Sequence, residues 1–319
     1  MPSDPAAPRI GVVGATGAVG TVTLELLAKR GFENVHPFAS SRSAGTRVPY
    51  DGRELEVEVA SPEALAAGAL DLCFFSVGTA ASRELVPPAR DAGAVCIDKS
   101  DAYRLENGVP LVVAGVNDSA LDGAGGIVAN PNCSAIQLCC VLQPLHEAAG
   151  LARVRLATYQ AASGAGDAGI EKLRSLDPAA GDLAMDWDFD GEEFSEEWKL
   201  RAETRKILGL PDLPLQATCV RVPVLVGHAQ AVWVETQDPL APEEAAQVLG
   251  ASPHVQLDDF PTPGQAAGRD EVLVGRIRRD ATDASGLALW IVNDNLRKGA
   301  ALNAIQIAEA LLERKLVPA

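Results

Sequence analysis

The stretch Ile10-Gly11-Val12-Val13-Gly14-Ala15-Thr16-Gly17-Ala18-Val19-Gly20 decides the fold of the N-terminal part of the chain. Its first four residues predict a buried strand, and residues 19–29 predict a helix that ends at Gly31. Glycines at every third position allow a tight turn and a close approach of the backbone to a pyrophosphate, which the helix N-terminus attracts. The spacing is GxxGxxG rather than GxGxxG, so a glycine-rich turn without a ligand is the alternative. The context predicts a phosphate loop with these ligands: Gly14, Thr16, Gly17, Ala18 and Val19.

Further apolar runs continue this alternation of strands and helices. Runs of strand length lie at residues 35–39, 72–77, 94–97, 111–114 and 127–129. Strands that alternate with helices build a parallel, doubly wound sheet. We therefore expect an α/β, Rossmann-type domain over residues 1–132, completed by a C-terminal helix over residues 296–319.

The residues after the second strand bear on the choice of cofactor. Enzymes that bind NAD usually place Asp or Glu on the ribose hydroxyls at this point, whereas this chain has Ser40-Ser41-Arg42-Ser43. An acid would repel a 2′-phosphate, but an arginine flanked by hydroxyls can bind one. The segment favours NADP over NAD; the alternative is a serine-rich turn with a solvated arginine.

Residues 133–295 have a different pattern. A helix is expected over residues 133–149, and a polar, acidic stretch at residues 177–197 reads as a loop or lid. Strands are expected at residues 153–161, 219–226, 231–236, 272–278 and 287–292. Few helices separate these strands, so we expect an α+β domain with a mixed sheet, followed by one long helix over residues 296–316.

Composition narrows the classes of partner. The formal net charge of -16 makes nucleic acid an unfavourable partner, because an acidic surface repels phosphate backbones. The six cysteines have no zinc-like spacing, so no metal site is expected. No apolar run approaches the roughly 20 residues of a membrane span, and no signal peptide opens the chain. These features predict a cytoplasmic protein with reduced thiols.

The segment Asn130-Pro131-Asn132-Cys133-Ser134 contains the candidate nucleophile. Asn132 is a good N-cap residue, which places Cys133 in the first turn of a helix, where the dipole favours a thiolate. Cys139 and Cys140 lie deeper in the same helix and lack this advantage. The alternative is a small buried thiol at a helix start. Composition does not choose a base partner among His36, His146, His228 and His254.

Eight segments, in order along almost the whole chain, together resemble the aspartate-semialdehyde dehydrogenase family. They are residues 14–20, residues 130–134, Tyr159-Gln160-Ala161-Ala162-Ser163-Gly164-Ala165-Gly166, Glu196-Glu197-Trp198-Lys199, Arg221-Val222-Pro223-Val224, Gly227-His228, Val274-Gly275-Arg276-Ile277-Arg278 and Asp294-Asn295-Leu296-Arg297-Lys298-Gly299-Ala300. The resemblance implies a Rossmann domain, a catalytic and dimerisation domain, and a site in the cleft between them.

The resemblance also implies residue roles. Cys133 is expected to form an acyl-thioester, His228 to act as general acid/base and Gln160 to orient the acyl intermediate. Arg221 is expected to bind the substrate carboxylate. Glu196 is expected to bind the amino group, and Lys199 the phosphate or carboxylate. Arg104 and Asn132 are expected to be phosphate ligands. Further cofactor contacts are expected at Thr79, Ser163, Gly164 and Asn295.

The reaction that these residue types suit is the NADPH-dependent reduction of L-aspartyl-4-phosphate to L-aspartate 4-semialdehyde and phosphate, in lysine, threonine and methionine biosynthesis. The resemblance implies a homodimer or homotetramer. One alternative is an N-acetyl-glutamyl-phosphate reductase, which has Gly where this chain has Asn132. Another is a catalytically silent paralogue, which typically lacks the nucleophile. Glu196 and Lys199 could also be a plain surface pair on a helix, and Arg221 a charge at a strand edge.

Three segments depart from the family's pattern. Residues 114–117 lack the usual Pro-Glu before Val-Asn, and Ala229 stands where Ser commonly follows the histidine. Residues 176–190 are acidic and lack the usual Ile-Pro-Gln-Ile-Asp. None of these departures removes a proposed catalytic group, but the third falls on the expected cover of the site.

Overall fold

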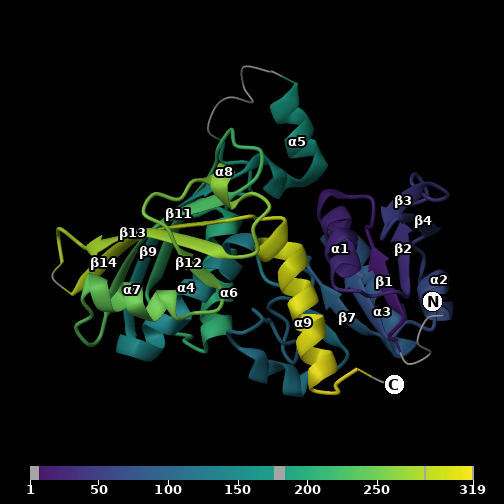
Figure 1. Cartoon of the computed structure of the whole chain (residues 1–319), viewed down its shortest axis with the longest axis horizontal. Coiled ribbons are helices and arrows are strands. Elements are labelled where there is room, and N and C mark those ends of the chain that lie inside the picture. Colours follow the sequence, from purple (N-terminus) through teal and green to yellow (C-terminus); the bar gives the residue numbers. More distant parts are fainter. Residues whose placement is uncertain (1–6, 176–183, 284, 318–319) are drawn as a thin grey trace. The chain divides into compact units, whose positions relative to one another are not determined.

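The chain divides into two compact units in the computed structural model, which describes residues 7–175, 184–283 and 285–317 (Figure 1). Unit 1 comprises Met1–Pro131 with Ala300–Ala319, and unit 2 comprises Asn132–Gly299. Each unit contains one six-stranded sheet.

The sheet of unit 1 is parallel throughout, in the order β5-β2-β1-β6-β7-β8. Numbered among themselves, these strands follow the order 3-2-1-4-5-6 of the Rossmann fold. The predicted doubly wound sheet is therefore confirmed. Its strands are β1 (Ile10–Val13), β2 (Val35–Ala39), β5 (Glu58–Val59), β6 (Leu72–Phe75), β7 (Val95–Asp98) and β8 (Ile127–Ala129).

Helices cover this sheet and close its core. Helix α9 (Leu302–Glu313) contacts both α1 (Ala18–Lys29) and β7, and its buried Ile305 and Leu311 share one hydrophobic cluster with the residues of β1. The C-terminal segment thus belongs to the core of unit 1. The other elements are a hairpin, β3 (Arg47–Tyr50) and β4 (Arg53–Glu56), the 3-10 helix η1 (Asp118–Gly123), and the helices α2 (Pro62–Ala67) and α3 (Thr79–Asp91).

Unit 2 contains a mixed sheet in the order β10-β9-β11-β14-β13-β12. Its two outer pairs are parallel and its three inner pairs are antiparallel. The predicted mixed-sheet α+β domain is confirmed. The strands are β9 (Leu151–Gln160), β10 (Leu215–Arg221), β11 (His228–Thr236), β12 (Val255–Leu257), β13 (Val272–Arg279) and β14 (Gly286–Asn293).

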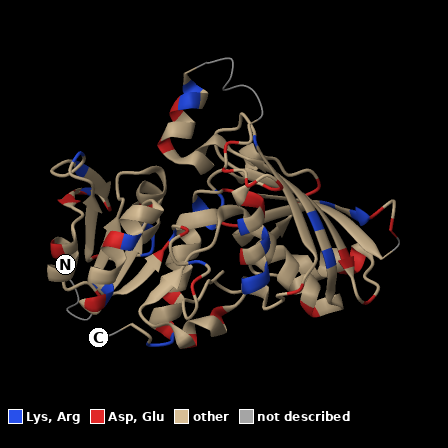
Figure 2. Ribbon diagram, turned by 180° about the vertical axis from the view of Figure 1, so that it is seen from behind, with Lys and Arg blue, Asp and Glu red and all other residues tan. Residues whose placement is uncertain are grey.

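Helix α4 (Cys133–Ala149) lies on this sheet, in contact with β9, β11 and β14, and packs against two further helices, α6 (Ser195–Leu208) and α7 (Pro242–Gly250). Side chains of β9 and β11 alternate between buried and exposed, so one face of the sheet forms the core with α4. Basic residues stand on exposed positions of the strands (Figure 2), where Arg153 and Arg155 of β9 pair with Glu235 of β11. Unit 2 also holds η2 (Ala162–Ala165), α5 (Gly166–Arg174) and α8 (Pro263–Ala266), and the π-helix η4 (Arg297–Ala301) spans the boundary between unit 2 and the C-terminal segment of unit 1.

Several sequence-based boundaries were wrong. Residues 111–114 form only an isolated bridge, Leu111 to Ala129 of the edge strand β8, because the chain then turns where the carbonyl of Val113 accepts from the amide of Val116. The strand expected at residues 219–226 ends at Arg221, since the chain turns where the amide of Val224 bonds to Val222 and Gly227 takes a φ of +104°. The C-terminal helix is shorter than the expected residues 296–316; it begins with the π-helix η4, continues directly into α9 and ends at Glu313.

The acidic stretch expected as a loop is partly helical, because residues 195–197 begin α6. Residues 184–194 have little regular structure beyond two isolated bridges, Ala184 to Arg221 and Phe189 to Phe194. The earlier part of the stretch, residues 176–183, lies outside the described residues.

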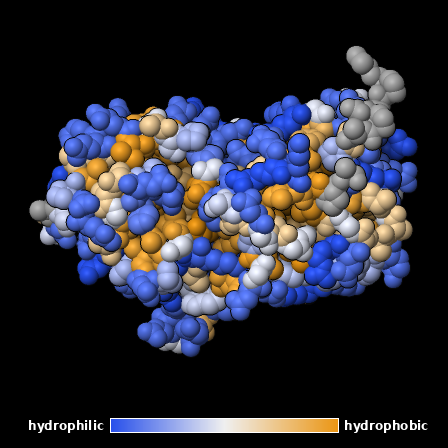
Figure 3. Space-filling view, turned by 90° about the horizontal axis from the view of Figure 1, so that it is seen from below, coloured by the Kyte–Doolittle hydropathy of each residue, from blue (hydrophilic) through white to orange (hydrophobic). Residues whose placement is uncertain are grey.

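The surface of the described residues is mixed in polarity. On the face shown in Figure 3, hydrophilic residues surround smaller hydrophobic patches. None of the helices in the described part of the chain has the length and apolarity needed to cross a membrane.

Candidate active site

Cys133 is the first residue of α4, directly after the turn that follows β8. The side-chain Oδ1 of Asn132 accepts hydrogen bonds from the amides of Ser134, at 2.8 Å, and Ala135, at 3.4 Å. This is the N-cap predicted from the sequence, and it is confirmed. The cap satisfies two of the free N–H groups of the first turn and fixes the turn that carries the thiol.

Burial separates Cys133 from the other cysteines. Among the described residues Cys133 is the one partly exposed thiol, whereas the remaining five are buried. Desolvation raises the pKa of Cys96 and of Cys219 to about 12 and raises the pKa of Cys73, Cys139 and Cys140. A nucleophile needs both access and a thiolate, so the geometry favours Cys133.

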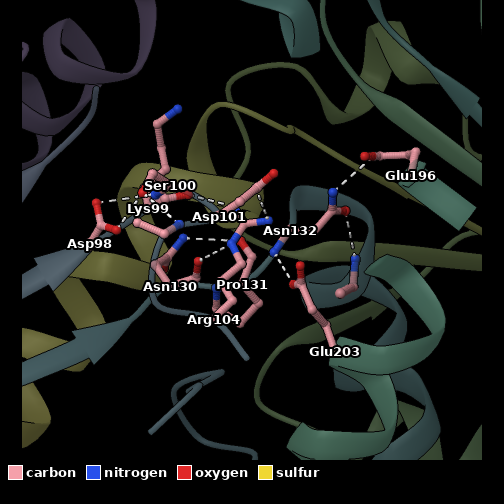
Figure 4. A network of polar contacts seen from close by, with 12 residues as sticks. Asp98, Lys99, Ser100, Asp101, Arg104, Asn130, Pro131, Asn132, Glu196 and Glu203 are labelled. Carbon is pink, nitrogen blue, oxygen red and sulfur yellow. Dashed lines mark hydrogen bonds and ion pairs between the residues drawn. The ribbon is translucent and has the colours of Figure 1, made fainter. Parts of the chain in front are cut away.

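Helix α6 holds Asn132 at two points (Figure 4). Oε2 of Glu203 accepts from the backbone amide of Asn132 at 2.6 Å, and Oε1 of Glu196 accepts from its side-chain Nδ2 at 2.9 Å. Seven residues, or about two helical turns, separate the two glutamates, so they lie on the same face of α6. Both carboxylates and Asn132 are buried. The residue before Cys133 is therefore fixed through its amide, its side-chain nitrogen and its side-chain oxygen.

Gln160 joins the same network. Its Nε2 donates to Oε1 of Glu196 at 3.0 Å, so this one carboxylate oxygen accepts from the amides of both Gln160 and Asn132. Gln160 ends β9 and lies opposite Arg221 at the end of the parallel strand β10. The start of β11 at His228 lies at the same edge of the sheet, paired with Asn293 of β14. Four predicted residues thus come together here: Gln160, Glu196, Arg221 and His228.

Cys133 is connected to this edge through Gly299. A β-carbon on Gly299 would lie 3.2 Å from the β-carbon of Cys133 and 3.3 Å from Nδ2 of Asn293. These contacts are tight for a side chain, so glycine allows the end of β14, which carries Asn293, to approach the nucleophile.

His228 is fully buried with its ring oriented by the backbone. The amide of Ala161 donates to Nδ1 at 3.0 Å, while Nε2 is buried without a hydrogen-bond partner among the described residues. Burial and the nearby charge of Arg221 lower the pKa of His228 from 6.5 to about 3. The imidazole is therefore neutral at physiological pH and carries its proton on Nε2.

Gly164 lies directly against the two functional groups of this edge. A β-carbon at this position would lie 2.8 Å from Nη1 of Arg221 and 3.0 Å from Nε2 of His228. The sequence predicted Gly164 as a cofactor contact; the structure also shows that any side chain here would displace Arg221 or His228.

Arg221 is mostly buried and has several partners. Its Nη1 donates to the carbonyl of Ala161 at 3.2 Å, its Nη2 lies 3.3 Å from Oδ1 of Asp186, and its Cζ lies 4.7 Å from the ring centre of Trp187. Lys199 is half-buried on α6, one turn after Glu196, so it projects from the same side of that helix.

Arg104 belongs to unit 1. Its Nε donates to the carbonyl of Asn130 at 3.1 Å, its Nη2 donates to the carbonyl of Lys99 at 2.5 Å, and its Nη1 lies 3.1 Å from Asp101 (Figure 4). These contacts hold the turn that leads to Asn132. The sequence predicted Arg104 as a phosphate ligand and did not reveal this supporting contact.

The glycine loop after β1 has the features of a phosphate-binding turn. Gly14 has a φ of +84°, and β-carbons at Gly14 and Gly20 would lie 2.4 Å and 2.0 Å from the carbonyl oxygens of Ser76 and Gly14, respectively. Helix α1 begins after Gly17, and none of the described side chains caps its N-terminus. The first-turn N–H groups can thus receive an anionic group, as the residues of a dinucleotide site must.

The other candidate cofactor residues of unit 1 lie at neighbouring strand ends. Gly14 and Ala15 donate to the carbonyl of Phe38 at the end of β2, next to Ser40-Ser41-Arg42-Ser43, of which the first three residues are exposed. Thr79 is exposed as the first residue of α3, following β6. Because β2, β1 and β6 are adjacent and parallel, these residues share the carboxyl edge of the sheet, where such folds bind nucleotides.

Ser163 and Asn295 contact each other in unit 2. Nδ2 of Asn295 donates to Oγ of Ser163 at 2.9 Å, and Oδ1 of Asn295 accepts from the amide of Gly227 at 2.9 Å. Asn295 therefore holds the loop that leads to His228, in addition to its predicted cofactor contact.

Comparisons with known proteins agree with this arrangement. Residues 9–124 match the family model described as semialdehyde dehydrogenase, NAD binding domain, and residues 184–298 match semialdehyde dehydrogenase, dimerisation domain. The chain is 45% identical to the aspartate-semialdehyde dehydrogenase of Corynebacterium melassecola, over 95% of this chain and 99% of the relative.

The chain belongs to the aspartate-semialdehyde dehydrogenase family.

Other members of this family, which consists of oxidoreductases, agree closely. The aspartate-semialdehyde dehydrogenase of Bacillus subtilis is 40% identical, over 97% of this chain and 99% of its own. A Vibrio cholerae aspartate semialdehyde dehydrogenase II, solved in complex with ASA, superposes with a TM-score of 0.91 and 38% identity, over 96% of this chain and 98% of its own. A Candida albicans aspartate semialdehyde dehydrogenase, solved with NADP, superposes with a TM-score of 0.80 and 26% identity, over 98% of this chain and all of its own.

Sequence reasoning missed Glu203 and Asp186. Glu203 stands seven residues after Glu196, and this helical spacing on one face of α6 is a signal that could have indicated it. Asp186 gave no comparable signal, because its contact with Arg221 depends on how an irregular segment meets β10.

Proposed function

We propose that this chain catalyses the NADP-dependent interconversion of L-aspartyl-4-phosphate and L-aspartate 4-semialdehyde with phosphate, through a thioester on Cys133. The observation that carries the proposal is the partly exposed Cys133 in the capped first turn of α4, while the other thiols of the described residues are buried. The membership in the family and the gathering of Gln160, Arg221 and His228 at one sheet edge support the same reaction.

In the reductive direction, the thiolate of Cys133 attacks the acyl-phosphate carbonyl, the C–O bond to phosphate breaks and a thioester forms. NADPH supplies, when bound, the hydride that reduces this thioester. The resulting thiohemiacetal collapses, releasing the aldehyde and regenerating the thiolate of Cys133. The N-terminus of α4, with the positive end of its helix dipole beside Cys133, is suited to stabilise the negative oxygen at each tetrahedral stage.

His228 contributes as a hydrogen-bond donor in this scheme. Its neutral imidazole presents Nε2–H, which stabilises charge on the substrate oxygen as a neutral histidine can do in an apolar site. The general acid/base role that the resemblance implies requires the other tautomer, in which Nε2 is free to accept a proton. Gln160, held by Glu196, orients the acyl group through its amide.

The remaining predicted residues fit the three charged groups of the substrate. Arg221 offers a planar fork for the carboxylate, and Glu196 offers a carboxylate for the amino group. Lys199, Arg104 and Asn132 are proposed for the phosphate, although Arg104 and Asn132 also support the turn before Cys133. NADP is proposed to bind through the glycine loop, Ser40 to Ser43 and Thr79 in unit 1, and through Ser163, Gly164 and Asn295 in unit 2.

We propose a homodimer, or a pair of homodimers, built on the exposed face of the unit 2 sheet. A concave area on this face is lined by side chains of β9, β10, β11 and β13, including Arg155, Gln216, Trp233 and Arg278. The match of residues 184–298 to a dimerisation domain supports this choice.

The test of the function is phosphate-dependent reduction of NADP by L-aspartate semialdehyde, with the wild type and Cys133→Ala measured side by side. We expect activity in the wild type and none in the variant. Activity only with N-acetyl-glutamate semialdehyde would support the related reductase instead. A wild type that binds NADP but oxidises neither aldehyde, with either NADP or NAD, would support a silent paralogue.

A further inference from the structure

The described part of the atypical acidic segment is docked against Arg221. Ala184 and Arg221 exchange two backbone hydrogen bonds, of 3.0 Å and 2.7 Å, which pair the segment with the end of β10. Two residues further on, Asp186 reaches Nη2 of Arg221 at 3.3 Å, and the Trp187 ring covers the guanidinium at 4.7 Å. The segment that departs from the family's pattern thus contacts the proposed carboxylate clamp through its backbone and two side chains.

The partners of Arg221 differ along the edges of its guanidinium. Nη1 is tied to the carbonyl of Ala161. Nε and Nη2 form the edge that can bind a carboxylate with two parallel hydrogen bonds. On this edge Nη2 contacts Asp186, whereas Nε is buried without a hydrogen-bond partner among the described residues. On this edge, Asp186 therefore occupies Nη2, and Nε remains available for a second hydrogen bond.

A small pocket lies beside this edge. It is lined by Arg221, Lys172 and Asp186, together with Ala162, Gly169 and Val222. Two cations and one acid around a pocket form an environment for an anion, in which the acid is the part that opposes binding. Asp186 is 43% exposed and Arg221 only 12% exposed, so the carboxylate can turn into solvent while the guanidinium stays fixed.

We propose that Asp186 is a specificity-determining residue that competes with the α-carboxylate of the substrate for Nε and Nη2 of Arg221. Trp187 keeps the guanidinium plane in place while one carboxylate replaces the other. A ligand displaces Asp186 only if its carboxylate accepts hydrogen bonds from both Nε and Nη2 of Arg221, because Asp186 contacts Nη2 alone. The inference rests on the proposed function, because Arg221 serves as a substrate clamp only in that reaction.

The expected effect is modest and has a definite sign. An exposed, single-contact ion pair changes an affinity by up to about fivefold. Removing the charge of Asp186 should therefore tighten the binding of the aldehyde by about three- to fivefold. Asp188 provides the matched control: it is exposed two residues further on, and its replacement changes the net charge equally without touching Arg221.

The test measures the Kd of L-aspartate semialdehyde by tryptophan fluorescence in the Cys133→Ala background, where no covalent adduct forms. Asp186→Asn and Asp186→Ala are compared with Asp188→Asn, and Trp187→Phe identifies the signal of the ring over Arg221. We expect a lower Kd in both Asp186 variants and an unchanged Kd in Asp188→Asn. In the active enzyme, Asp186→Asn should lower KM and leave kcat unchanged.

The outcomes separate this inference from the proposed function. Equal Kd values in Asp186→Asn and Asp188→Asn, or weaker binding in Asp186→Asn, would overturn the competition while leaving the proposed reaction intact. Absence of binding in all variants, together with absence of turnover in the wild type, would overturn the proposed substrate and the inference with it.

Discussion

The backbone amide of Ala161 donates a 3.0 Å hydrogen bond to Nδ1 of His228. A backbone amide can only donate, so Nδ1 is an acceptor and the proton of the neutral ring lies on Nε2. Burial reinforces this state, because it lowers the pKa of His228 to about 3. The group that faces the site is therefore an N–H donor, set by the position of one residue in the Gln-to-Gly segment.

This relationship predicts a pH dependence of stability. The unfolded chain takes up a proton on His228 near pH 6.5, whereas the folded chain does so only near pH 3. Between these values the unfolded state binds more protons, so stability rises with pH and falls on acidification. Relative to His228→Gln, the wild type should lose about 1.4 kcal/mol of unfolding free energy per pH unit below about pH 6.

Denaturant unfolding of both proteins across this range measures the difference. Nitrogen NMR of the labelled imidazole provides an independent check, with the Nε2–H form expected from about pH 5 to about pH 8. A constant stability difference, or a proton on Nδ1, would contradict the assignment.

Glu203 should be needed for the reactivity of Cys133. Glu203→Gln keeps an acceptor for the amide of Asn132, whereas Glu203→Met removes it. Both variants are uncharged, so they differ in the ability to accept this hydrogen bond and not in charge. Leaving that buried amide unpaired costs about 1–3 kcal/mol, and a misplaced nucleophile can cost up to about 100-fold in rate. We expect kcat and the rate of Cys133 alkylation by iodoacetamide to fall at least about tenfold in the Met variant relative to the Gln variant.

Ile207→Val is the control for this pair, because Ile207 is buried on the same helix and its truncation removes only packing. It should cost about 0.5–1.5 kcal/mol of stability and leave the alkylation rate unchanged. Equal alkylation rates in the Gln and Met variants would limit Glu203 to a structural role.

Gly164→Ala should reduce activity without unfolding the protein. The new methyl group would meet Nη1 of Arg221 at 2.8 Å and Cε1 of His228 at 2.9 Å, so one of these groups must move. We expect kcat/KM to fall about 10- to 100-fold. Gly264→Ala is the matched control, because a β-carbon there meets no atom within 4 Å. A Gly164→Ala enzyme as active as the control would place His228 and Arg221 outside the reaction.

Arg42 should determine the preference for NADP. Loss of a charge-assisted contact with the 2′-phosphate corresponds to about 10- to 100-fold in affinity. Arg42→Ala is therefore expected to raise KM for NADP by at least about tenfold while KM for NAD changes little. Arg47→Ala, at an exposed position on β3, is the control for the change in surface charge. Parallel changes in both KM values would show that Arg42 does not read the 2′-phosphate.

The sequence predicted regular elements best where a periodic pattern met a clear cap. The bounds of α4 follow from its Asn132 cap and Gly150, and the glycine loop marks the first strand and helix of the Rossmann unit. The sequence-based prediction failed where long-range strand pairing determines the structure. Residues 111–114 are as apolar as a strand, yet they make only one bridge, to the edge strand β8.

The candidate site shows the same limit. Cys133, Gln160, Arg221 and His228 were found through motifs, and the structure places the last three at one sheet edge. The contacts that orient them were not predictable, since they join α6 to the turn before α4 and the amide of Ala161 to His228. Such contacts depend on the register of the strands and on the packing of α6 rather than on local sequence.

The most direct test of the central claim is a pre-steady-state measurement without phosphate. The enzyme is mixed with NADP and L-aspartate semialdehyde, NADPH formation is followed, and the quenched protein is analysed by peptide mass spectrometry. We predict a rapid burst of about one NADPH per active site and an aspartyl group on Cys133, because the thioester then lacks its phosphate acceptor. Steady NADPH formation without a burst, or an acyl group on another residue, would contradict the thioester mechanism at Cys133.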